Sequence, residues 1–149
     1  LLVVGVCGGL RSHLATGTLV HCVAAYQTDL ADLPGREVRA DDALRRAWQS
    51  VAPAREGWFL TADRPVLSLW RRVRLARIFS GDCVADMETA AVGAVATGAG
   101  VPWAALRAVT DRATGWGALS FRVHYGSQAG RAADTVPELL AHLQSGTPT

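Results

Sequence analysis

Lysine is absent from the sequence: its 15 basic residues are all arginine, against 13 acidic residues, and the formal net charge is only +2. No single mechanism requires every lysine to be arginine, so we interpret this absence as genome composition. A nearly neutral chain lacks the broad basic surface of a nucleic-acid-binding domain. Four arginines and Trp70 crowd residues 66–79, which we interpret as a solvated helix face. We therefore predict no nucleic-acid partner.

Cysteine is scarce and shows no pairing pattern. Cys7, Cys22 and Cys83 are an odd number without C-x-x-C spacing, and two of them lie in apolar runs typical of strands. This pattern predicts reduced, buried thiols in a cytoplasmic protein. Neither the cysteines nor the histidines have metal-ligand spacing, so we predict no metal site and no cofactor. Cys7 has no histidine close in sequence to activate it, which favours a buried strand residue over a nucleophile.

Long apolar runs are also missing. No segment reaches the roughly 18 unbroken apolar residues of a membrane-spanning helix, so we predict no membrane partner. The first residues, LLVVGVCGGL, are apolar but lack the basic region of a signal peptide. The chain starts without methionine, inside a predicted strand. We therefore expect a domain that is incomplete at its N-terminus.

The remaining composition is that of one globular domain. Half of the 149 residues are hydrophobic and 19% are charged, and we find no repeat, linker or low-complexity tract. Residues 1–149 are therefore predicted to form a single domain.

Predicted strands alternate with predicted helices along the chain. Leu1 to Val6 is an apolar run typical of a strand buried on both faces, and residues 27–39 are predicted to be a polar loop. Pro137 is expected to kink or break the last helix. The predicted strands are 1–6, 17–26, 57–62, 83–86 and 101–111, and the predicted helices are 42–51, 66–79, the segment from the Met-Glu pair to Gly98, and 120–143. This order predicts a three-layer α/β fold with a mostly parallel or mixed central sheet flanked by helices.

Three predicted strands end in residues that could bind or transform a ligand. The first ends in GVCGGL, the strand 83–86 ends in Asp86-Met87-Glu88, and the strand 101–111 ends in Asp111. Ligands of α/β sheets bind beyond the carboxyl ends of strands, and glycines let a ligand approach the backbone. If these strands are neighbours, Glu88 and Asp111 face one crevice beside a glycine turn.

Each of these residues also has a simpler interpretation. Glu88 is favoured at a helix N-terminus by the helix dipole alone, and Asp111 could merely cap the following loop. Met87 is of a type that more often fills a core. Asp86 is explained by no functional pattern and could be a helix cap.

Four segments in order, VVGVCGGL, GTLV, VADMETAAVGAV and VPWAALRAVTDRA, resemble the purine nucleoside phosphorylase and nucleosidase superfamily. Its members include methylthioadenosine/adenosylhomocysteine nucleosidases, futalosine hydrolases and hopanoid-associated phosphorylases. The resemblance covers essentially the whole chain. It is strongest at the Met-Glu pair and at the Arg-x-x-[Ser/Thr]-Asp strand end.

The resemblance implies cleavage of the N-glycosidic bond of a purine nucleoside or adenosyl-type substrate, through an oxocarbenium-like transition state. Asp111 then matches the general acid at purine N7, and Glu88 matches the acceptor of the ribose 2′- and 3′-hydroxyls. The further substrate-binding residues implied are Met87 against the ribose, the backbone of Cys7, Gly8 and Gly9, and Ala62 within the segment that flanks the purine.

The sequence also departs from the family. Val3 and Val6 stand where many phosphorylases carry a phosphate-binding Arg and Ser, which favours water over phosphate as co-substrate. Family members also have an additional N-terminal stretch that in nucleosidases supplies a water-activating glutamate. Two alternatives therefore stay open: a phosphate-dependent phosphorylase, and an inactive nucleoside-binding remnant. Because the family forms oligomers, we expect a homo-oligomer.

Overall fold

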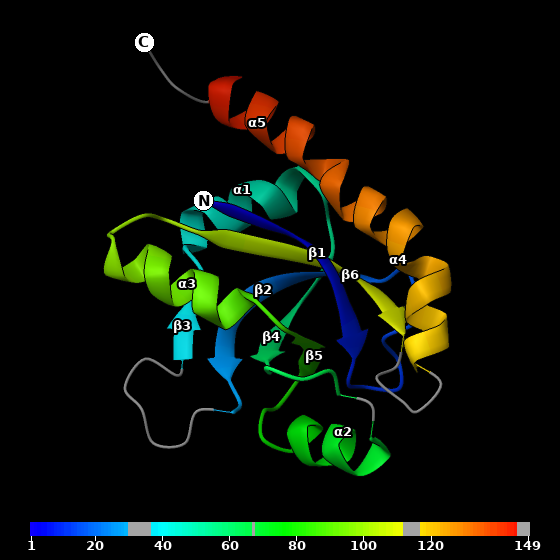
Figure 1. The fold of residues 1–149 in the computed structure, drawn as a ribbon. Coiled ribbons are helices and arrows are strands. Elements are labelled where there is room, and N and C mark those ends of the chain that lie inside the picture. Colours follow the sequence, from blue (N-terminus) through cyan, green and yellow to red (C-terminus); the bar gives the residue numbers. More distant parts are fainter. Residues whose placement is uncertain (30–36, 67, 112–116, 146–149) are drawn as a thin grey trace.

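The computed structural model describes residues 1–29, 37–66, 68–111 and 117–145 of the chain. It contains six strands and five helices in these ranges (Figure 1). The strands are β1 (Leu2–Gly9), β2 (Leu19–Gln27), β3 (Glu37–Arg39), β4 (Arg55–Thr61), β5 (Asp82–Asp86) and β6 (Ala104–Asp111). The helices are α1 (Asp42–Val51), α2 (Leu69–Ala76), α3 (Thr89–Gly98), α4 (Gly117–Ala133) and α5 (Thr135–Ser145).

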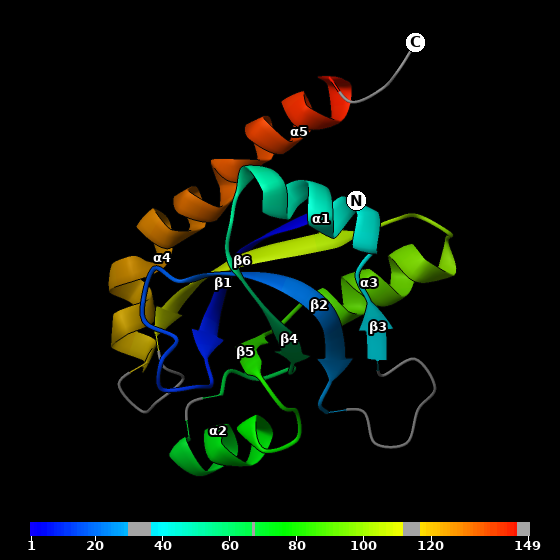
Figure 2. The same ribbon diagram turned by 180° about the vertical axis from the view of Figure 1, so that it is seen from behind.

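The strands form one mixed sheet in the order β3-β2-β4-β5-β1-β6. The pairs β1–β6, β2–β4 and β4–β5 are parallel, whereas β1–β5, β2–β3 and β2–β6 are antiparallel. Because β2 also pairs with β6, the strands other than β3 close into a ring. Helices α1 and α5 lie together at one end of the strands and α2 at the other, in both views (Figures 1 and 2). The predicted α/β fold with a mixed sheet and flanking helices is confirmed.

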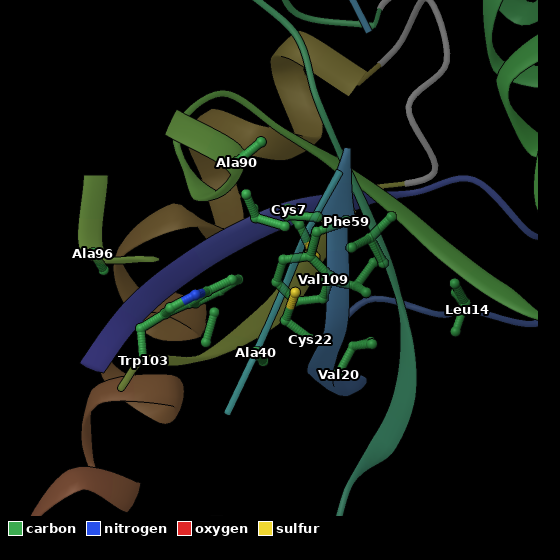
Figure 3. Close-up of a cluster of buried hydrophobic side chains, with 14 residues drawn as sticks. Cys7, Leu14, Val20, Cys22, Ala40, Phe59, Ala90, Ala96, Trp103 and Val109 are labelled. Carbon is green, nitrogen blue, oxygen red and sulfur yellow. The ribbon is translucent and has the colours of Figure 1, made fainter. Parts of the chain in front are cut away.

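The largest hydrophobic cluster joins α3 to the sheet around Trp103 and Phe59 (Figure 3). Helix α3 contains no charged residue, and its small side chains let it approach closely. A Cβ on Gly93 would lie 2.6 Å from an indole carbon of Trp103, too close for any residue but glycine. Thr97 accepts a hydrogen bond from the Trp103 indole nitrogen at 3.2 Å. The small-residue run therefore packs the helix on the sheet, as the sequence predicts.

The prediction of a loop over residues 27–39 is wrong for the last three residues. Residues 37–39 form β3, because Val38 pairs with Ala25 and is buried in the main core. The Pro34-Gly35 part of that predicted loop lies outside the described residues. A three-residue strand gives almost no periodicity in sequence, so only its pairing with β2 identifies it.

Strand β1 is less buried than its composition predicts. Leu2, Val3 and Val6 are half-buried and Val4 is 37% exposed, so the prediction of a strand buried on both faces is wrong. Residues Leu2 to Cys7 pair with β6 alone among the described strands, and β5 joins only at Gly8 and Gly9.

The last helical segment is divided at Asp134. The sequence places the break at Pro137, but this proline is the third residue of α5. A proline is tolerated in the first turn because its missing N–H would have no partner within the helix. The break therefore precedes the proline by three residues.

All three cysteines are free and buried, as predicted. Burial raises the pKa of the Cys22 and Cys83 thiols, which keeps them protonated at neutral pH. Among the helices of the described residues, none is long and apolar enough to cross a membrane.

We expect the stability of the fold to fall in acid because of His21. This side chain is fully buried on β2, packs edge-on against Trp48, and makes one hydrogen bond, from Nε2 to the carbonyl oxygen of Ala52 at 2.9 Å. Burial lowers its pKa below 6.5, outweighing the opposite effects of the Ala52 carbonyl and Glu56. Between this lowered pKa and 6.5, the unfolded chain binds a proton that the folded protein does not. The free energy of unfolding should then decrease with falling pH, by up to about 1.4 kcal/mol per unit.

Urea unfolding at pH 7.5, 6.5 and 5.5 measures this slope. In the variant His21→Gln, the free energy of unfolding should depend less on pH, because the contribution of this side chain is removed. The exposed His142 on α5 provides the matched control, since His142→Gln should keep the slope of the parent. An unchanged slope in His21→Gln would show that other groups cause the acid sensitivity.

Candidate active site

The ends of four strands meet around Gly8. This residue is paired with Asp111 of β6 on one side and with Ala85 of β5 on the other. On the far side of β5, Asp86 is paired with Thr61, the last residue of β4. The strand ends that carry Glu88 and Asp111 are therefore both adjacent to β1, which fulfils the condition set by the sequence.

The two glycines after Cys7 differ in their surroundings. The register of β1 against β6 shifts between Cys7 and Gly8, so that Thr110 of β6 is passed over, and Gly8 is half-buried. Gly9 is buried, and a Cβ there would lie 2.9 Å from the carbonyl oxygen of Leu14. Packing within the chain therefore requires a glycine at position 9.

Glu88 occupies the N-cap position of α3, but its side chain caps nothing. Its Oε2 atom instead accepts a hydrogen bond from Nη2 of Arg107 at 2.9 Å. Oε1 makes no hydrogen bond to the described residues, and the side chain is 58% exposed. Besides its place at the N-terminus of the helix, Glu88 thus has a specific partner on β6. A charge-assisted bond orients the carboxylate while one oxygen stays accessible.

Met87 is 46% exposed, so interpreting it as a core residue is wrong. Ala62 is fully buried, and its N–H donates to the carbonyl oxygen of Asp86 at 3.0 Å. The structure thus joins Ala62 to the same strand end through its backbone rather than through its side chain.

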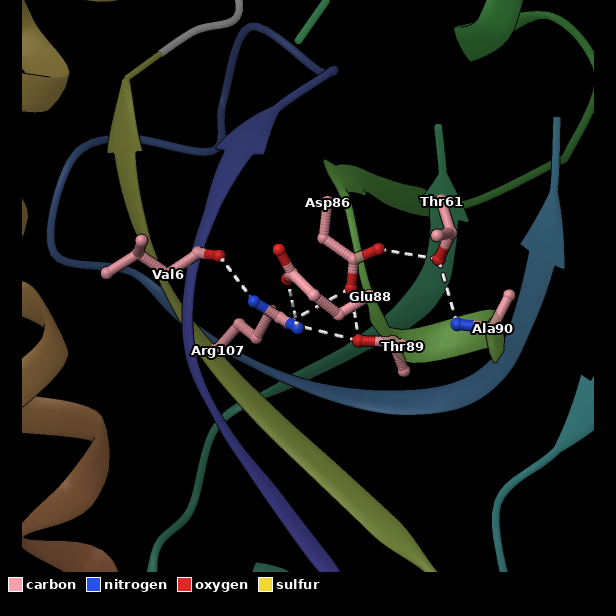
Figure 4. Close-up of polar contacts among 7 residues, drawn as sticks. All are labelled: Val6, Thr61, Asp86, Glu88, Thr89, Ala90 and Arg107. Carbon is pink, nitrogen blue, oxygen red and sulfur yellow. Dashed lines mark hydrogen bonds and ion pairs between the residues drawn. The ribbon is translucent and has the colours of Figure 1, made fainter. Parts of the chain in front are cut away.

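Asp86, which the sequence left unexplained, is the centre of a buried polar network (Figure 4). Its side chain is fully buried and lies 3.0 Å from Nε of Arg107. Thr61 donates to Asp86 Oδ1 at 2.6 Å, and Thr89 donates to Oδ2. The hydroxyl of Thr61 also accepts from the N–H of Ala90 at 2.9 Å. Asp86 therefore links β4, β5, β6 and the start of α3.

Arg107 connects this network to β1. Its Nη1 donates to the carbonyl oxygen of Val6 at 3.0 Å, and Nε donates to Thr89 Oγ1 at 3.1 Å. Sequence reasoning included this arginine in a motif but gave it no role. The available signal was an arginine within the apolar strand AALRAVT, because a buried guanidinium requires a carboxylate partner.

Asp111 is half-buried at the end of β6. The hydroxyl of Thr110 lies 3.0 Å from Asp111 Oδ2 and 3.2 Å from the carbonyl oxygen of Cys7. One hydroxyl proton cannot serve both acceptors at once. The Thr110 hydroxyl therefore lies between the Asp111 carboxyl group and the backbone of β1.

Cys7 itself is not a nucleophile. Its side chain is buried, and burial raises the pKa of its thiol far above neutrality, despite the opposing effect of Arg107. Only its backbone can contribute to a ligand site. In the described part of the chain no group of three or more His, Cys, Asp or Glu side chains could hold a metal ion.

Several solved structures share this fold. A mutant futalosine hydrolase of Helicobacter pylori matches with a TM-score of 0.88 and 22% identity, over 94% of this chain and 67% of that one. A mutant methylthioadenosine/adenosylhomocysteine nucleosidase of H. pylori, with 5′-methylthioadenosine in its active site, matches at 0.87 and 22%, over 94% and 67%. A putative nucleosidase of this kind from Francisella philomiragia gives 0.87 and 24%, over 94% and 68%.

At these identities the likeness concerns the fold, and this chain spans about two thirds of the length of these structures. No curated protein sequence matches the chain. The sequence pattern of the phosphorylase superfamily matches residues 1–144, nearly the whole length. The chain therefore belongs to the phosphorylase superfamily.

Proposed function

We propose that this protein cleaves the N-glycosidic bond of a purine nucleoside or an adenosyl-type nucleoside, with water as the favoured acceptor. The observation that carries the proposal is the pairing of Gly8 with both Ala85 and Asp111. This pairing supports a common site for an oriented carboxylate, Glu88, and a half-buried carboxyl group, Asp111. Glycosidic cleavage needs two such functions: one that holds the sugar and one that protonates the leaving group.

Glu88 is proposed to bind the ribose. Its Oε1, which bonds to none of the described residues, and its partly engaged Oε2 can accept hydrogen bonds from the two vicinal hydroxyls, because a carboxylate has several acceptor positions. The exposed side chain of Met87 lies beside it in sequence and offers an apolar contact for the sugar ring.

Asp111 is proposed as the general acid. In the reaction, electrons of the breaking C–N bond move onto the purine, and a proton delivered to N7 lets the base leave as a neutral molecule. Thr110 orients the carboxyl group at 3.0 Å from Oδ2. The backbone of Cys7, Gly8 and Gly9 and the segment after Ala62 are proposed to flank the base and ribose.

Val3 and Val6 favour hydrolysis. Val3 packs against the main hydrophobic cluster, and the carbonyl oxygen of Val6 is bonded to Arg107. Neither side chain can bind an anion, so neither can hold a phosphate nucleophile.

A coupled assay that measures the release of adenine from 5′-methylthioadenosine, with and without phosphate, tests the proposal. This compound is chosen because it occupies the active site of the H. pylori nucleosidase. We expect release that does not depend on phosphate. If adenine release requires phosphate, the protein is a phosphorylase and the proposal of a hydrolase is wrong.

A third outcome is binding of purine nucleosides without release of any base. It would identify a nucleoside-binding protein that does not cleave these nucleosides. The expected homo-oligomer stays a prediction, which sedimentation in the presence of the nucleoside would measure.

A further inference from the structure

We propose that Asp86 is a positioning residue for nucleoside binding. It fixes the guanidinium of Arg107, so that Glu88 binds this arginine through Oε2 alone and keeps Oε1 for the hydroxyls of the ligand. This inference rests on the proposed function of Glu88. Asp86 itself does not touch the ligand, because its side chain is fully buried.

The place of Asp86 is fixed from three sides. Thr61 from β4 and Thr89 from α3 donate to its two oxygens, and Arg107 from β6 lies 3.0 Å from Oδ2. A buried carboxylate with this many donors is held in one orientation. It therefore sets the direction from which Nε of the arginine must approach.

The donors of Arg107 are divided among different partners as a result. Nε faces Asp86 and Thr89, and Nη1 donates to the carbonyl oxygen of Val6. Only Nη2 reaches Glu88. The guanidinium is also enclosed by β1, since a Cβ on Gly5 would lie 3.1 Å from Nη1. Arg107 therefore cannot turn its bidentate face to Glu88 while Asp86 is in place.

The charges lead to the same conclusion. Arg107 is one cation between two carboxylates, one buried and one 58% exposed. Removing the charge of Asp86 would leave Glu88 as the one carboxylate partner of this cation among the described residues. Glu88 would then be drawn onto Arg107 with both oxygens, and it would accept hydrogen bonds from a ligand less well.

The test compares two ligands that cannot be cleaved: a C-nucleoside analogue of adenosine and its 2′,3′-dideoxy counterpart. Calorimetry measures both dissociation constants in the parent and in Asp86→Asn. In the parent we expect the diol to bind about 10- to 100-fold more tightly, because its hydroxyls bond to a charged group. In Asp86→Asn this preference should fall about tenfold, with the dideoxy affinity nearly unchanged.

Asp82→Asn is the matched control. Asp82 begins the same strand and also pairs with an arginine, Arg55, and with His13 at 2.5 Å, but it lies at the opposite end of β5. The Asp82→Asn variant should therefore have the same preference for the diol ligand as the parent. An equal loss of affinity for both ligands in Asp86→Asn would indicate a merely structural role and would overturn the inference.

A parent protein without any diol preference would overturn the proposed role of Glu88 itself. A parent with the preference, and an Asp86→Asn variant that keeps it, would overturn only the positioning role. If Asp86→Asn does not fold, Arg107→Lys provides the second test. A lysine ammonium retains the charge but cannot span the same partners, so the diol preference should fall here too. A preference equal to that of the parent would contradict the proposal.

Discussion

Asp111→Asn is expected to lower kcat for purine nucleoside cleavage by about 10²- to 10⁴-fold, the usual contribution of general acid catalysis. The dissociation constant of an uncleavable nucleoside should change less than about threefold, because the amide keeps the shape of the side chain. Thr110 can still donate to the amide oxygen of the variant at the place where it now meets Oδ2. The amide, however, has no proton to transfer to the leaving base.

A change of leaving group separates this role from a loss of structure. A p-nitrophenyl riboside releases a stable anion that needs little protonation, so Asp111→Asn should cleave it nearly as well as the parent does. Asp134→Asn, at the break between α4 and α5, is the control and should retain full activity on both substrates. Equal losses on both substrates, or equal losses in binding and turnover, would contradict the general-acid role.

The strand ends could be predicted from sequence because apolar runs followed by glycine or acidic residues identify them. As predicted, Gly8 and Asp111 lie at the ends of β1 and β6, and Glu88 follows the end of β5, at the N-cap position of α3. Whether these three strands are neighbours in the sheet could not be predicted from the sequence. The pairing of β1 between β5 and β6 joins Gly8 to Ala85, 77 positions away, and to Asp111, 103 positions away, and no local pattern encodes it.

The same limit explains the other differences. Strand β3 exists because β2 offers it an edge, and the ring closes because Leu19 pairs with Ala108. The composition of β1 predicted burial, but burial depends on which strands lie beside it, and along most of its length β6 is its one described partner. Local sequence thus predicts the type of an element better than its surroundings.

The two acidic residues around Met87 illustrate this limit in the site. Both Asp86 and Glu88 precede an apolar helix, and sequence alone gave the ligand role to Glu88 and at most a cap to Asp86. In the structure both meet Arg107, one buried and one largely exposed. Their difference comes from the arginine of another strand, 19 residues beyond Glu88. The different roles of Asp86 and Glu88 can therefore be recognised only from the position of Arg107 on β6.

Arg107→Met is expected to have the largest effect on stability, reducing the free energy of unfolding by about 3–5 kcal/mol. The side chain of Arg107 is 6% exposed, and its removal would leave the fully buried carboxylate of Asp86 without its cation. It would also leave the carbonyl oxygen of Val6 without this donor. Urea unfolding at pH 7.5 measures the loss. Arg39→Met, which breaks an exposed pair with Glu37, should cost at most about 1 kcal/mol.

The reason for the loss can be tested with a double-mutant cycle. If the main cost is the buried charge left behind, removing that charge as well should restore part of the stability. Asp86→Asn combined with Arg107→Met should therefore be more stable than the sum of the single losses predicts, by about 1–3 kcal/mol. Strict additivity would instead mean that Arg107 stabilises the fold mainly through Val6 and Thr89. In that case the main role of the arginine would be to hold β1, β6 and α3 together by hydrogen bonds, rather than to neutralise the charge of Asp86.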